Sequence, residues 1–344
     1  MTSKHGAESE SGPSASRSAT SSRKHHRSKH DSVNREGHAA AETDSFWYQS
    51  LQTPPPSNFT PGMILLLKKA LLNSHSRGKT RRAVLCFDRA VYVSGQSWDA
   101  GWGCGYRNFL MSCSSLMDQH LQSMYFPLLD SPISPSVRQL QLWLEVAWSS
   151  GFDVQGAEQL SPLVGSNKWI GVSDLYTAFS SRGIPCELVD FNYKQSFHGN
   201  DALIQWIIDY FSPPTEIHRP TNLTEALMNP SVKCTEKMPI ILQDGWHSRT
   251  VVGYERISDS KVNLLVFDPS RRPRSKIRKA ALDINDAASA RVEDELLHDA
   301  LKHFRYRLFN NVFGKQWQIL YFPMTEPLTE SQMERRKVVV STRA

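Results

Sequence analysis

Helical and strand patterns occupy largely separate parts of this 344-residue chain, and their order constrains the fold more than any other feature. Apolar residues recur at helical spacing in the stretches 63–72, 104–119, 136–150 and 203–211. Apart from an early buried strand at 83–87, short β-rich runs follow at 239–243, 249–254, 262–268 and 316–322. Helices that precede a group of neighbouring strands favour an α+β fold over alternating βαβ units.

The apolar residues that can form a core begin near Phe46. Residues 1–45 contain almost no large apolar side chain, so we expect a disordered, basic and Ser-rich tail. Its basic run, 23–30, is interpreted as solvated sequence, with nuclear import or nucleic-acid binding as the alternative. One folded domain is expected over 46–326, and the polar residues 327–344 are expected to form a loose tail.

Hydropathy and cysteine usage exclude several classes of protein. The longest aliphatic runs are far shorter than the roughly 20 residues that cross a bilayer, and the first residues lack an apolar signal segment. The five cysteines are odd in number and widely spaced, which argues against a disulfide framework or a zinc ribbon. We expect a cytoplasmic or nuclear protein that needs no metal or cofactor, and a monomer without a membrane partner.

The net charge of +6 reflects one segment of the chain. Residues 271–279 carry six Lys and Arg side chains, as many as the whole net charge. We favour a solvated loop here over a nucleic-acid-binding surface. DNA binding with a steep salt dependence would support the second interpretation.

Cys104 alone among the cysteines has the setting of a nucleophile. It stands in the run Trp-Gly-Cys-Gly-Tyr-Arg at the first turn of a predicted helix, where unpaired N–H groups and the helix dipole stabilise a thiolate. Its flanking glycines keep side chains away from the sulfur, so a substrate carbonyl can approach and the Cys104 N–H can donate to an oxyanion. The other thiols are expected to be inert: Cys86 and Cys186 in strand-like runs, Cys113 on a core face and Cys234 in a polar loop.

Partners for such a cysteine are expected far away in the sequence. His247 begins a predicted strand after a Gly-Trp turn, and Asp268 ends the next strand, where a carboxylate can fix the imidazole tautomer. Gln243 ends the preceding strand and offers an amide as a second oxyanion donor. Spacing alone also allows structural roles for both residues. His247 could simply form a hydrogen bond near its turn, and Asp268, which precedes Pro269, could form an Asx-type turn. Together with Cys104, the His and Asp would form a triad in papain-like chain order.

Four motifs resemble the ZUFSP-type cysteine peptidases, which are deubiquitinases related to the proteases of the ubiquitin-fold modifier. Residues 98–108 resemble the nucleophile motif D-D-G-W-G-C-G-Y-R-N, departing at Ala100, and 151–157, 168–171 and 247–250 match further signatures. The resemblance implies a papain-like peptidase domain over 46–326. In that fold, a helix-borne Cys packs against an antiparallel-rich sheet that carries His and Asp.

The resemblance also implies residue roles. It assigns Cys104 as the nucleophile and His247 as the general base. It assigns Asp268 as the residue that orients His247, and Gln243 as the residue that stabilises the oxyanion. Asp153 and Asp174 would contact the basic tail of ubiquitin, since carboxylates pair well with arginine. Without the resemblance, both acids are interpreted as solvated or helix-capping residues.

One departure from the wider family bears on the substrate. The sister proteases carry their catalytic histidine in an Asp-Pro-His triplet, whereas this chain has Asp268, Pro269 and Ser270. The resemblance therefore favours a ubiquitin-directed thiol hydrolase that uses His247 and cleaves after the C-terminal glycine. Two alternatives stay open: a protease for the ubiquitin-fold modifier, and a non-catalytic ubiquitin-binding protein. The sequence has no Cys/His spacing for a zinc finger, so the preferred type of ubiquitin chain is also open.

Overall fold

A mixed β-sheet runs through the computed structural model, which describes residues 44–192, 199–212, 230–308 and 316–344. Its main path is β11 (Ser341–Arg343), β4 (Glu187–Asn192), β10 (Gln316–Tyr321), β6 (Ile240–Gln243), β7 (Ser248–Ser258), β2 (Arg82–Leu85) and β5 (Val232–Cys234). From β7 the sheet continues through β8 (Lys261–Phe267) to β9 (Arg305–Tyr306). Among the described pairings only β11 with β4 and β2 with β5 are parallel, so the sheet is antiparallel-rich.

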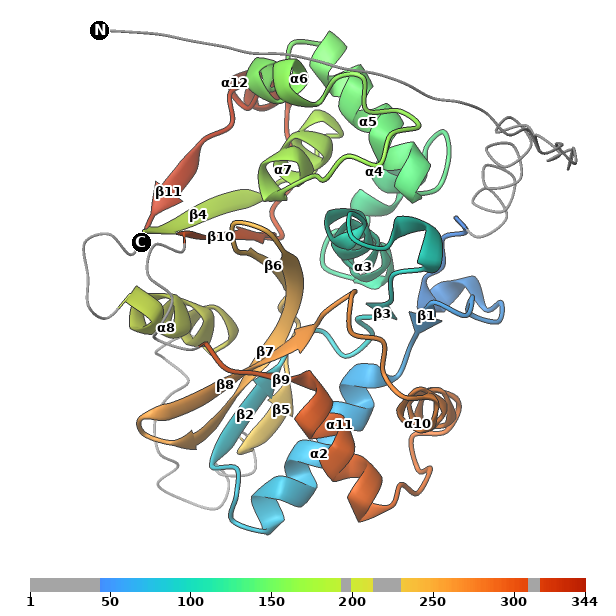
Figure 1. Ribbon diagram of the computed structural model, residues 1–344, viewed down its shortest axis with the longest axis vertical. Helices are drawn as coiled ribbons and strands as arrows, with labels where there is room; N and C mark the ends of the chain where they lie inside the picture. The colour runs from blue at the N-terminus through green and yellow to red at the C-terminus, as the bar shows by residue number, and fades with distance from the viewer. Residues whose placement is uncertain (1–43, 193–198, 213–229, 309–315) are drawn as a thin grey trace, which may run out of the picture.

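Most helices gather in two groups (Figure 1). The upper group in that view consists of α3 (Cys104–Asp118), α4 (Tyr125–Asp130), α5 (Val137–Ser149), α6 (Val154–Leu160) and α7 (Val172–Ser181). The lower group packs α2 (Met63–Ser76) with α10 (Ser275–Asp286) and α11 (Asp294–Phe304). The other described elements are α8 (Gly199–Phe211), α12 (Glu330–Arg335), the strands β1 (Phe59–Thr60) and β3 (Tyr92–Val93), and the 3-10 turns η1 (Gln49–Leu51) and η2 (Ser97–Asp99). Within the described part of the chain, no helix has the length and apolar character to cross a membrane.

Helix α3 lies at the centre of the core. Every residue from Gly105 to Asp118 is buried, because β7, α4, β3, α5 and α7 all pack against the helix. Asn108 ties the helix to the sheet: its Nδ2 donates to Ser248 Oγ at 2.8 Å, and its Oδ1 accepts from Thr250 Oγ1 at 2.9 Å. These buried bonds hold the first turns of α3 against the start of β7.

The predicted α+β class is confirmed, although strand β2 precedes α3, and α10, α11 and α12 follow strands of the sheet. The pattern at 104–119 corresponds to α3, and the runs at 249–254 and 262–268 correspond to β7 and β8. The solvated-loop interpretation is wrong for the end of the basic run, because α10 begins at Ser275. The buried face of α10 consists of Ile277, Ala280, Ala281 and Ile284, and its many charges on the other face concealed this pattern.

The C-terminal segment 327–344 is not the loose tail that its polar composition predicts. It contains α12 and β11, and β11 pairs in parallel with β4. Arg336 donates to the Glu187 carboxylate at 2.5 Å and to the Cys186 carbonyl at 2.6 Å. Composition misleads here because much of the anchoring comes from polar bonds to a sheet edge, with Val339 packed against the core. Of the predicted N-terminal tail, residues 1–43 lie outside the described residues.

Candidate active site

Cys104 is the first residue of α3 and is partly buried. The loop before it is held by Asp99, whose Oδ1 accepts the Gln96 N–H at 2.6 Å. Asp99 Oδ2 pairs with Arg107 Nε at 2.6 Å, and both side chains are wholly buried. This ion pair connects the loop to the first turn of the helix, so it fixes the position of Cys104.

Close packing also requires glycine at both positions beside Cys104. A Cβ on Gly103 would lie 2.4 Å from Asp99 Oδ2, and one on Gly105 would lie 2.5 Å from the Ile170 carbonyl oxygen. Both distances are well below van der Waals contact. The first glycine therefore admits the buried carboxylate, and the second brings the segment 168–171 against the start of α3.

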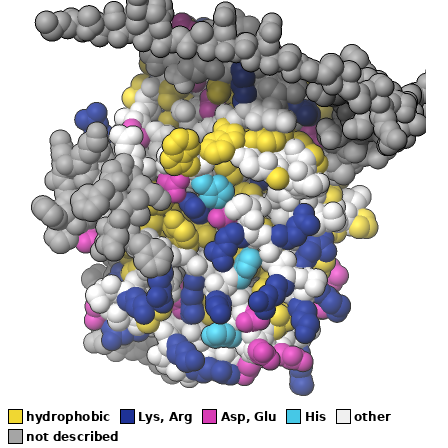
Figure 2. All heavy atoms as spheres, viewed as in Figure 1, with side chains coloured by type: hydrophobic (Ala, Val, Ile, Leu, Met, Phe, Trp, Pro, Cys, Tyr) yellow, Lys and Arg dark blue, Asp and Glu magenta, His cyan; other side chains and the backbone are white. Residues whose placement is uncertain are grey.

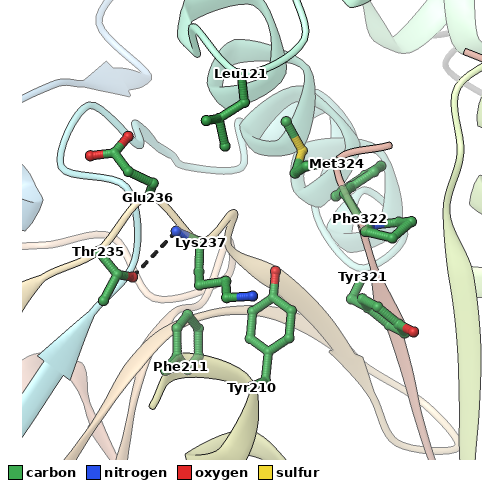
Figure 3. Close-up of a pocket in the computed structure, with 10 residues that line it drawn as sticks. Leu121, Tyr210, Phe211, Thr235, Glu236, Lys237, Tyr321, Phe322 and Met324 are labelled. Atoms are coloured by element: carbon green, nitrogen blue, oxygen red, sulfur yellow. Dashed lines mark hydrogen bonds between the residues drawn. The ribbon is translucent and has the colours of Figure 1, made fainter. Parts of the chain in front are cut away.

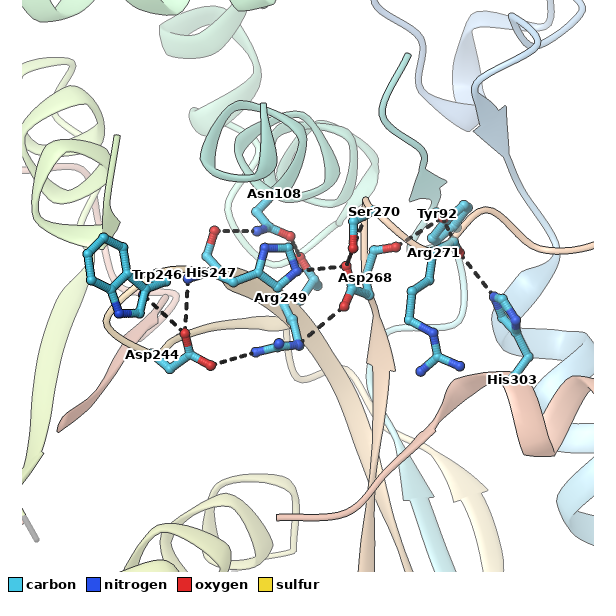
Figure 4. A network of polar contacts seen from close by, with 12 residues as sticks. Tyr92, Asn108, Asp244, Trp246, His247, Arg249, Asp268, Ser270, Arg271 and His303 are labelled. Carbon is cyan, nitrogen blue, oxygen red and sulfur yellow. Dashed lines mark hydrogen bonds and ion pairs between the residues drawn. The ribbon is translucent and has the colours of Figure 1, made fainter. Parts of the chain in front are cut away.

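His247 lies in the turn of the β6–β7 hairpin, and Asp268 directly follows β8 at the open end of the β7–β8 hairpin. The two side chains meet there (Figure 4). His247 Nε2 lies 2.8 Å from Asp268 Oδ1, although the two residues are 21 positions apart. The same Oδ1 accepts the Ser270 hydroxyl at 2.6 Å and the Ser270 N–H at 3.0 Å. Asp244 fixes the turn that carries the histidine, because its Oδ1 accepts the N–H groups of Trp246 and His247.

The acid–base properties of the site indicate an ion pair. Burial alone would raise the pKa of Cys104, but hydrogen bonds from His247 and Ser248 lower it from its usual value of 9.0. Burial alone would lower the pKa of His247, but its hydrogen bonds to Asp268 and Cys104 raise it to about 9. Burial also acts to raise the pKa of Asp268, yet its hydrogen bond to His247 holds that pKa well below its usual range. All three shifts act in the same direction, toward a thiolate beside an imidazolium and an ionised carboxylate.

Ser248 is a site residue that sequence reasoning missed. Asn108 Nδ2 donates to its hydroxyl oxygen, and both the hydroxyl and the N–H of Ser248 act to lower the pKa of the Cys104 thiol. Its place directly after His247 on β7 was the available signal, but the Asn108 contact that orients it joins residues 140 positions apart.

Gln243 ends β6 and faces Ser248 across the β6–β7 ladder. Its Oε1 accepts the Val172 N–H at the start of α7, at 2.7 Å. This bond occupies the carbonyl end of the amide and leaves the Nε2 end to donate. The structure thus places Gln243 next to the turn of His247, and its role as an oxyanion donor stays a prediction.

The two predicted tail-binding acids both cap helices. Asp153 is the N-cap of α6, and its Oδ1 accepts the Gly156 N–H at 3.1 Å. Asp174 lies in the first turn of α7, and its Oδ2 accepts the Gly171 N–H at 2.7 Å. Asp174 is only 6% exposed, and burial, with a smaller contribution from the charge of Asp153, raises its pKa to about 6. The helix-cap interpretation describes both side chains, and their contact with a basic tail stays a prediction.

An exposed pair of tryptophans stands beside the site. Trp246 is 78% exposed and Trp169 is 49% exposed, and their rings meet edge to face with centroids 6.3 Å apart. Trp246 directly precedes His247, and Trp169 belongs to the segment that packs on Gly105. Figure 2 shows hydrophobic side chains gathered above a histidine on this face, with Lys and Arg side chains below it. Exposed apolar surface of this kind is typical of a site that binds a partner.

The other four thiols have raised pKa values, whereas the pKa of Cys104 is lowered. Burial raises the pKa of Cys86 and Cys113 well above the usual value, that of Cys186 to about 12 and that of Cys234 to about 11. Cys234 lies in β5 and not in the predicted loop. High thiol pKa values are expected of inert structural cysteines.

A pocket of about 560 Å³ lies elsewhere, between the end of α8, the segment 235–237 and the end of β10 (Figure 3). Its aromatic lining comes from Tyr210, Phe211, Tyr321 and Phe322. The ammonium of Lys237 lies 5.4 Å from the centroid of the Tyr210 ring. None of the six predicted site residues, all of which are described, lines this pocket.

Curated proteins with similar sequences include zinc finger-containing ubiquitin peptidase 1 of Mus musculus, 37% identical over 212 residues that cover 61% of this chain and 34% of the relative. The Homo sapiens protein of that name is 35% identical over 246 residues, 71% of this chain and 38% of the relative. Ubiquitin carboxyl-terminal hydrolase mug105 of Schizosaccharomyces pombe is 26% identical over 225 residues, 64% of this chain and 82% of the relative. This chain spans about a third of the length of the zinc finger-containing relatives.

Among solved structures, UfSP from C. elegans aligns with 71% of this chain and 34% of its own, with a TM-score of 0.36 and 14% identity. The model of peptidase family C78 matches residues 78–309. That match spans more than half of the chain and includes Cys104, His247 and Asp268. By this match, the chain belongs to peptidase family C78.

Proposed function

We propose that this peptidase is a deubiquitinating enzyme that hydrolyses the peptide or isopeptide bond after the C-terminal glycine of ubiquitin. The observation that carries the proposal is the 2.8 Å contact of His247 with Asp268, on a histidine that also acts to lower the pKa of Cys104 at the start of α3. The curated relatives, at 26% to 37% identity, are named as ubiquitin peptidases or ubiquitin hydrolases. Family membership supports the reaction class, and these relatives support the substrate.

The first half of the reaction forms a thioester. The Cys104 thiolate attacks the glycine carbonyl carbon, and the negative charge moves to the carbonyl oxygen. The Cys104 N–H, unpaired at the first turn of α3, donates to this oxyanion together with Gln243 Nε2. The His247 imidazolium then protonates the leaving lysine amine as the carbon–nitrogen bond breaks.

The second half releases ubiquitin. His247 is now neutral and takes a proton from water, which attacks the thioester and frees the C-terminal carboxylate and the Cys104 thiolate. Asp268 stabilises the imidazolium in both steps, and Ser270 holds Asp268 through two bonds to Oδ1. Ser270 thus supports the carboxylate at the position where the sister proteases carry a histidine, which favours the ubiquitin branch.

The tail of the modifier is proposed to approach past the tryptophan pair and Asp153. Asp153 lies at the N-cap of α6, where its charge can pair with a tail arginine. Asp174 contributes from a buried position, so neutral variants test it better than charge reversal. We expect Asp153→Lys to raise KM for a ubiquitin substrate several-fold and Asp174→Asn to raise it less. Unchanged kinetics in both would remove these acids from the recognition site.

The deciding experiment is covalent capture by two C-terminally electrophilic probes, one built on ubiquitin and one on the ubiquitin-fold modifier. Wild type is compared with Cys104→Ala and with Cys113→Ala, a matched variant of a thiol on the same helix. Capture of ubiquitin that is lost only in Cys104→Ala supports the proposal. Preferential capture of the other modifier moves the chain to the sister branch, and measurable ubiquitin binding without capture supports a non-catalytic binding protein.

A further inference from the structure

Arg249 lies between the two carboxylates that hold His247 in place (Figure 4). Its Nη1 lies 3.3 Å from Asp244 Oδ2, and its Nε lies 3.3 Å from Asp268 Oδ2. The side chains are 13%, 7% and 9% exposed for Arg249, Asp244 and Asp268, so water competes little for these contacts. The guanidinium also packs over the ring of Tyr306, 4.8 Å from its centroid.

The backbone pairing of β7 with β8 ends one residue before the side-chain contacts of Arg249. The pairing of β7 with β8 ends at Thr250 and Phe267, so the next opposed residues, Arg249 and Asp268, are joined by their side chains. On its other side, β7 is joined to β6 by the turn 244–247, which Asp244 holds through two backbone N–H groups. One side chain therefore spans the ends of two hairpins, of which one carries His247 and the other carries Asp268.

We propose that Arg249 is a positioning residue for the peptidase reaction: it bridges Asp244 and Asp268 and thereby fixes the orientation of His247 toward Cys104. The reaction it serves rests on the proposed function. A guanidinium suits this bridge because its donors lie in one rigid plane and reach two carboxylates in a set geometry, whereas an ammonium is a single point charge. Removing the bridge leaves two buried carboxylates without their shared cation.

Titratable and charged groups surround this bridge on every side. They are Cys104 of α3, Tyr92 of β3, Asp244 and His247 of the β6–β7 turn, Asp268 and Arg271 after β8, His303 of α11 and Tyr306 of β9. The charge of Arg249 acts to lower the pKa of His247, against the effect of Asp268. A variant at Arg249 therefore changes both geometry and charge, and two variants are needed to separate them.

The test compares Arg249→Met, which keeps much of the stem, with Arg249→Lys, which keeps the charge without the planar fork. Arg256→Met is the matched control, because Arg256 lies on the same strand and donates to the Asp259 carbonyl at the far turn. One readout is the rate at which iodoacetamide alkylates Cys104, resolved from the other thiols by peptide mass, from about pH 5 to about pH 9. The other is kcat and KM on ubiquitin with a C-terminal aminocoumarin.

We expect Arg249→Met to lower kcat roughly 100-fold and to change KM less than about twofold, because a misplaced histidine affects the transition state more than binding. Alkylation of Cys104 in the acid part of the pH profile falls roughly tenfold, because a loosened His247 no longer holds the pKa of the thiol down. Arg249→Lys stays as slow as Arg249→Met. Arg256→Met matches wild type in both readouts.

Full kcat and an unchanged alkylation profile in Arg249→Met would overturn the bridge, as would full recovery in Arg249→Lys. If Arg249→Met does not fold, Arg249→Lys decides alone. An additive loss in the double variant of Arg249→Met and Asp244→Asn also contradicts the bridge, since residues that act through one contact give less than additive losses. If wild type does not cleave the ubiquitin substrate but the alkylation profile shifts in Arg249→Met, the proposed function fails and the bridge stands.

Discussion

Two cysteines on the same helix, Cys104 and Cys113, have opposite chemistry. Cys104 begins α3, and hydrogen bonds from His247 and Ser248 lower the pKa of its thiol. Cys113 lies nine residues further along that helix, fully buried, and burial raises the pKa of its thiol well above the usual value. The covalent group is identical, so the difference comes from what surrounds each sulfur.

The comparison teaches that burial alone makes a thiol inert and that charged or polar donors reverse this effect. Both sulfurs lose solvation on folding. The start of α3 lies beside the β6–β7 turn, which carries His247, and His247 bonds to Asp268 at the end of β8. The following predictions alter one side of this comparison at a time, beginning with the largest expected effect.

Replacing each sulfur in turn separates chemistry from packing. We expect Cys104→Ala to abolish hydrolysis of a ubiquitin substrate and to leave the unfolding temperature nearly unchanged. Cys113→Ala should retain activity but lower the free energy of unfolding by about 1 kcal/mol, because it removes a buried group from the core. Turnover and thermal unfolding of both variants check this, and activity that survives in Cys104→Ala would end the mechanism.

His247→Ala should make Cys104 resemble Cys113. The imidazolium that stabilises the thiolate is lost, so burial dominates and the pKa of the Cys104 thiol rises above its usual value. Turnover should fall about 10²- to 10⁴-fold, the usual contribution of a general acid–base group. The pH dependence of Cys104 alkylation measures the pKa directly, and an unchanged profile would show that another group activates the thiol.

Gln243 allows the oxyanion role to be separated from its structural bond. Gln243→Glu keeps an oxygen that accepts the Val172 N–H but removes the amide donor, whereas Gln243→Ala removes both. We expect each variant to lose about 10²- to 10³-fold in kcat, the range for one oxyanion donor. Retention of full kcat in Gln243→Glu, with a correctly folded chain, would restrict Gln243 to holding the start of α7.

The pH profile tests the ion pair as a whole. Because the pKa of His247 is raised to about 9, kcat/KM should fall about tenfold per pH unit above that value as the imidazolium is lost. On the acid side it should fall only below the lowered pKa of Cys104. The same shift stabilises the fold fully below pH 6.5, and this contribution is lost as the pH rises through about 9. A profile with an alkaline limb near pH 6.5 would contradict the pairing of His247 with Asp268.

Ser248→Ala is expected to give the smallest effect. It removes the lowering effect of the hydroxyl on the pKa of Cys104 but keeps that of the Ser248 N–H, so this pKa should rise only slightly. Alkylation at about pH 6 should then slow by a few-fold. Asn108→Ala should reproduce this loss if Asn108 orients the hydroxyl, and a faster reaction in either variant would exclude that contact.

Local sequence patterns predicted the fold class and most residues of the candidate site without any structure. The helical period after Cys104, the β-rich runs around His247 and Asp268, and the run 98–108 identified the fold class and the residues of the candidate site. These features are readable because periodicity and turn chemistry act over a few neighbouring residues. The same reasoning missed α10 and the order of the C-terminal segment, where few large apolar residues mark the buried face.

Tertiary structure alone decided how these groups act. The ion pair of Asp99 with Arg107, the bond of Asn108 to Ser248 and the position of Arg249 between Asp244 and Asp268 depend on distances that composition and periodicity do not encode. The pKa of a thiol or an imidazole depends on charges and donors within a few ångströms, and the groups that lower the pKa of Cys104 are His247 and Ser248, from a distant part of the sequence. The sequence by itself therefore determined which side chains are available to the candidate site, and the packing of α3 against β7 decided which cysteine has a lowered pKa.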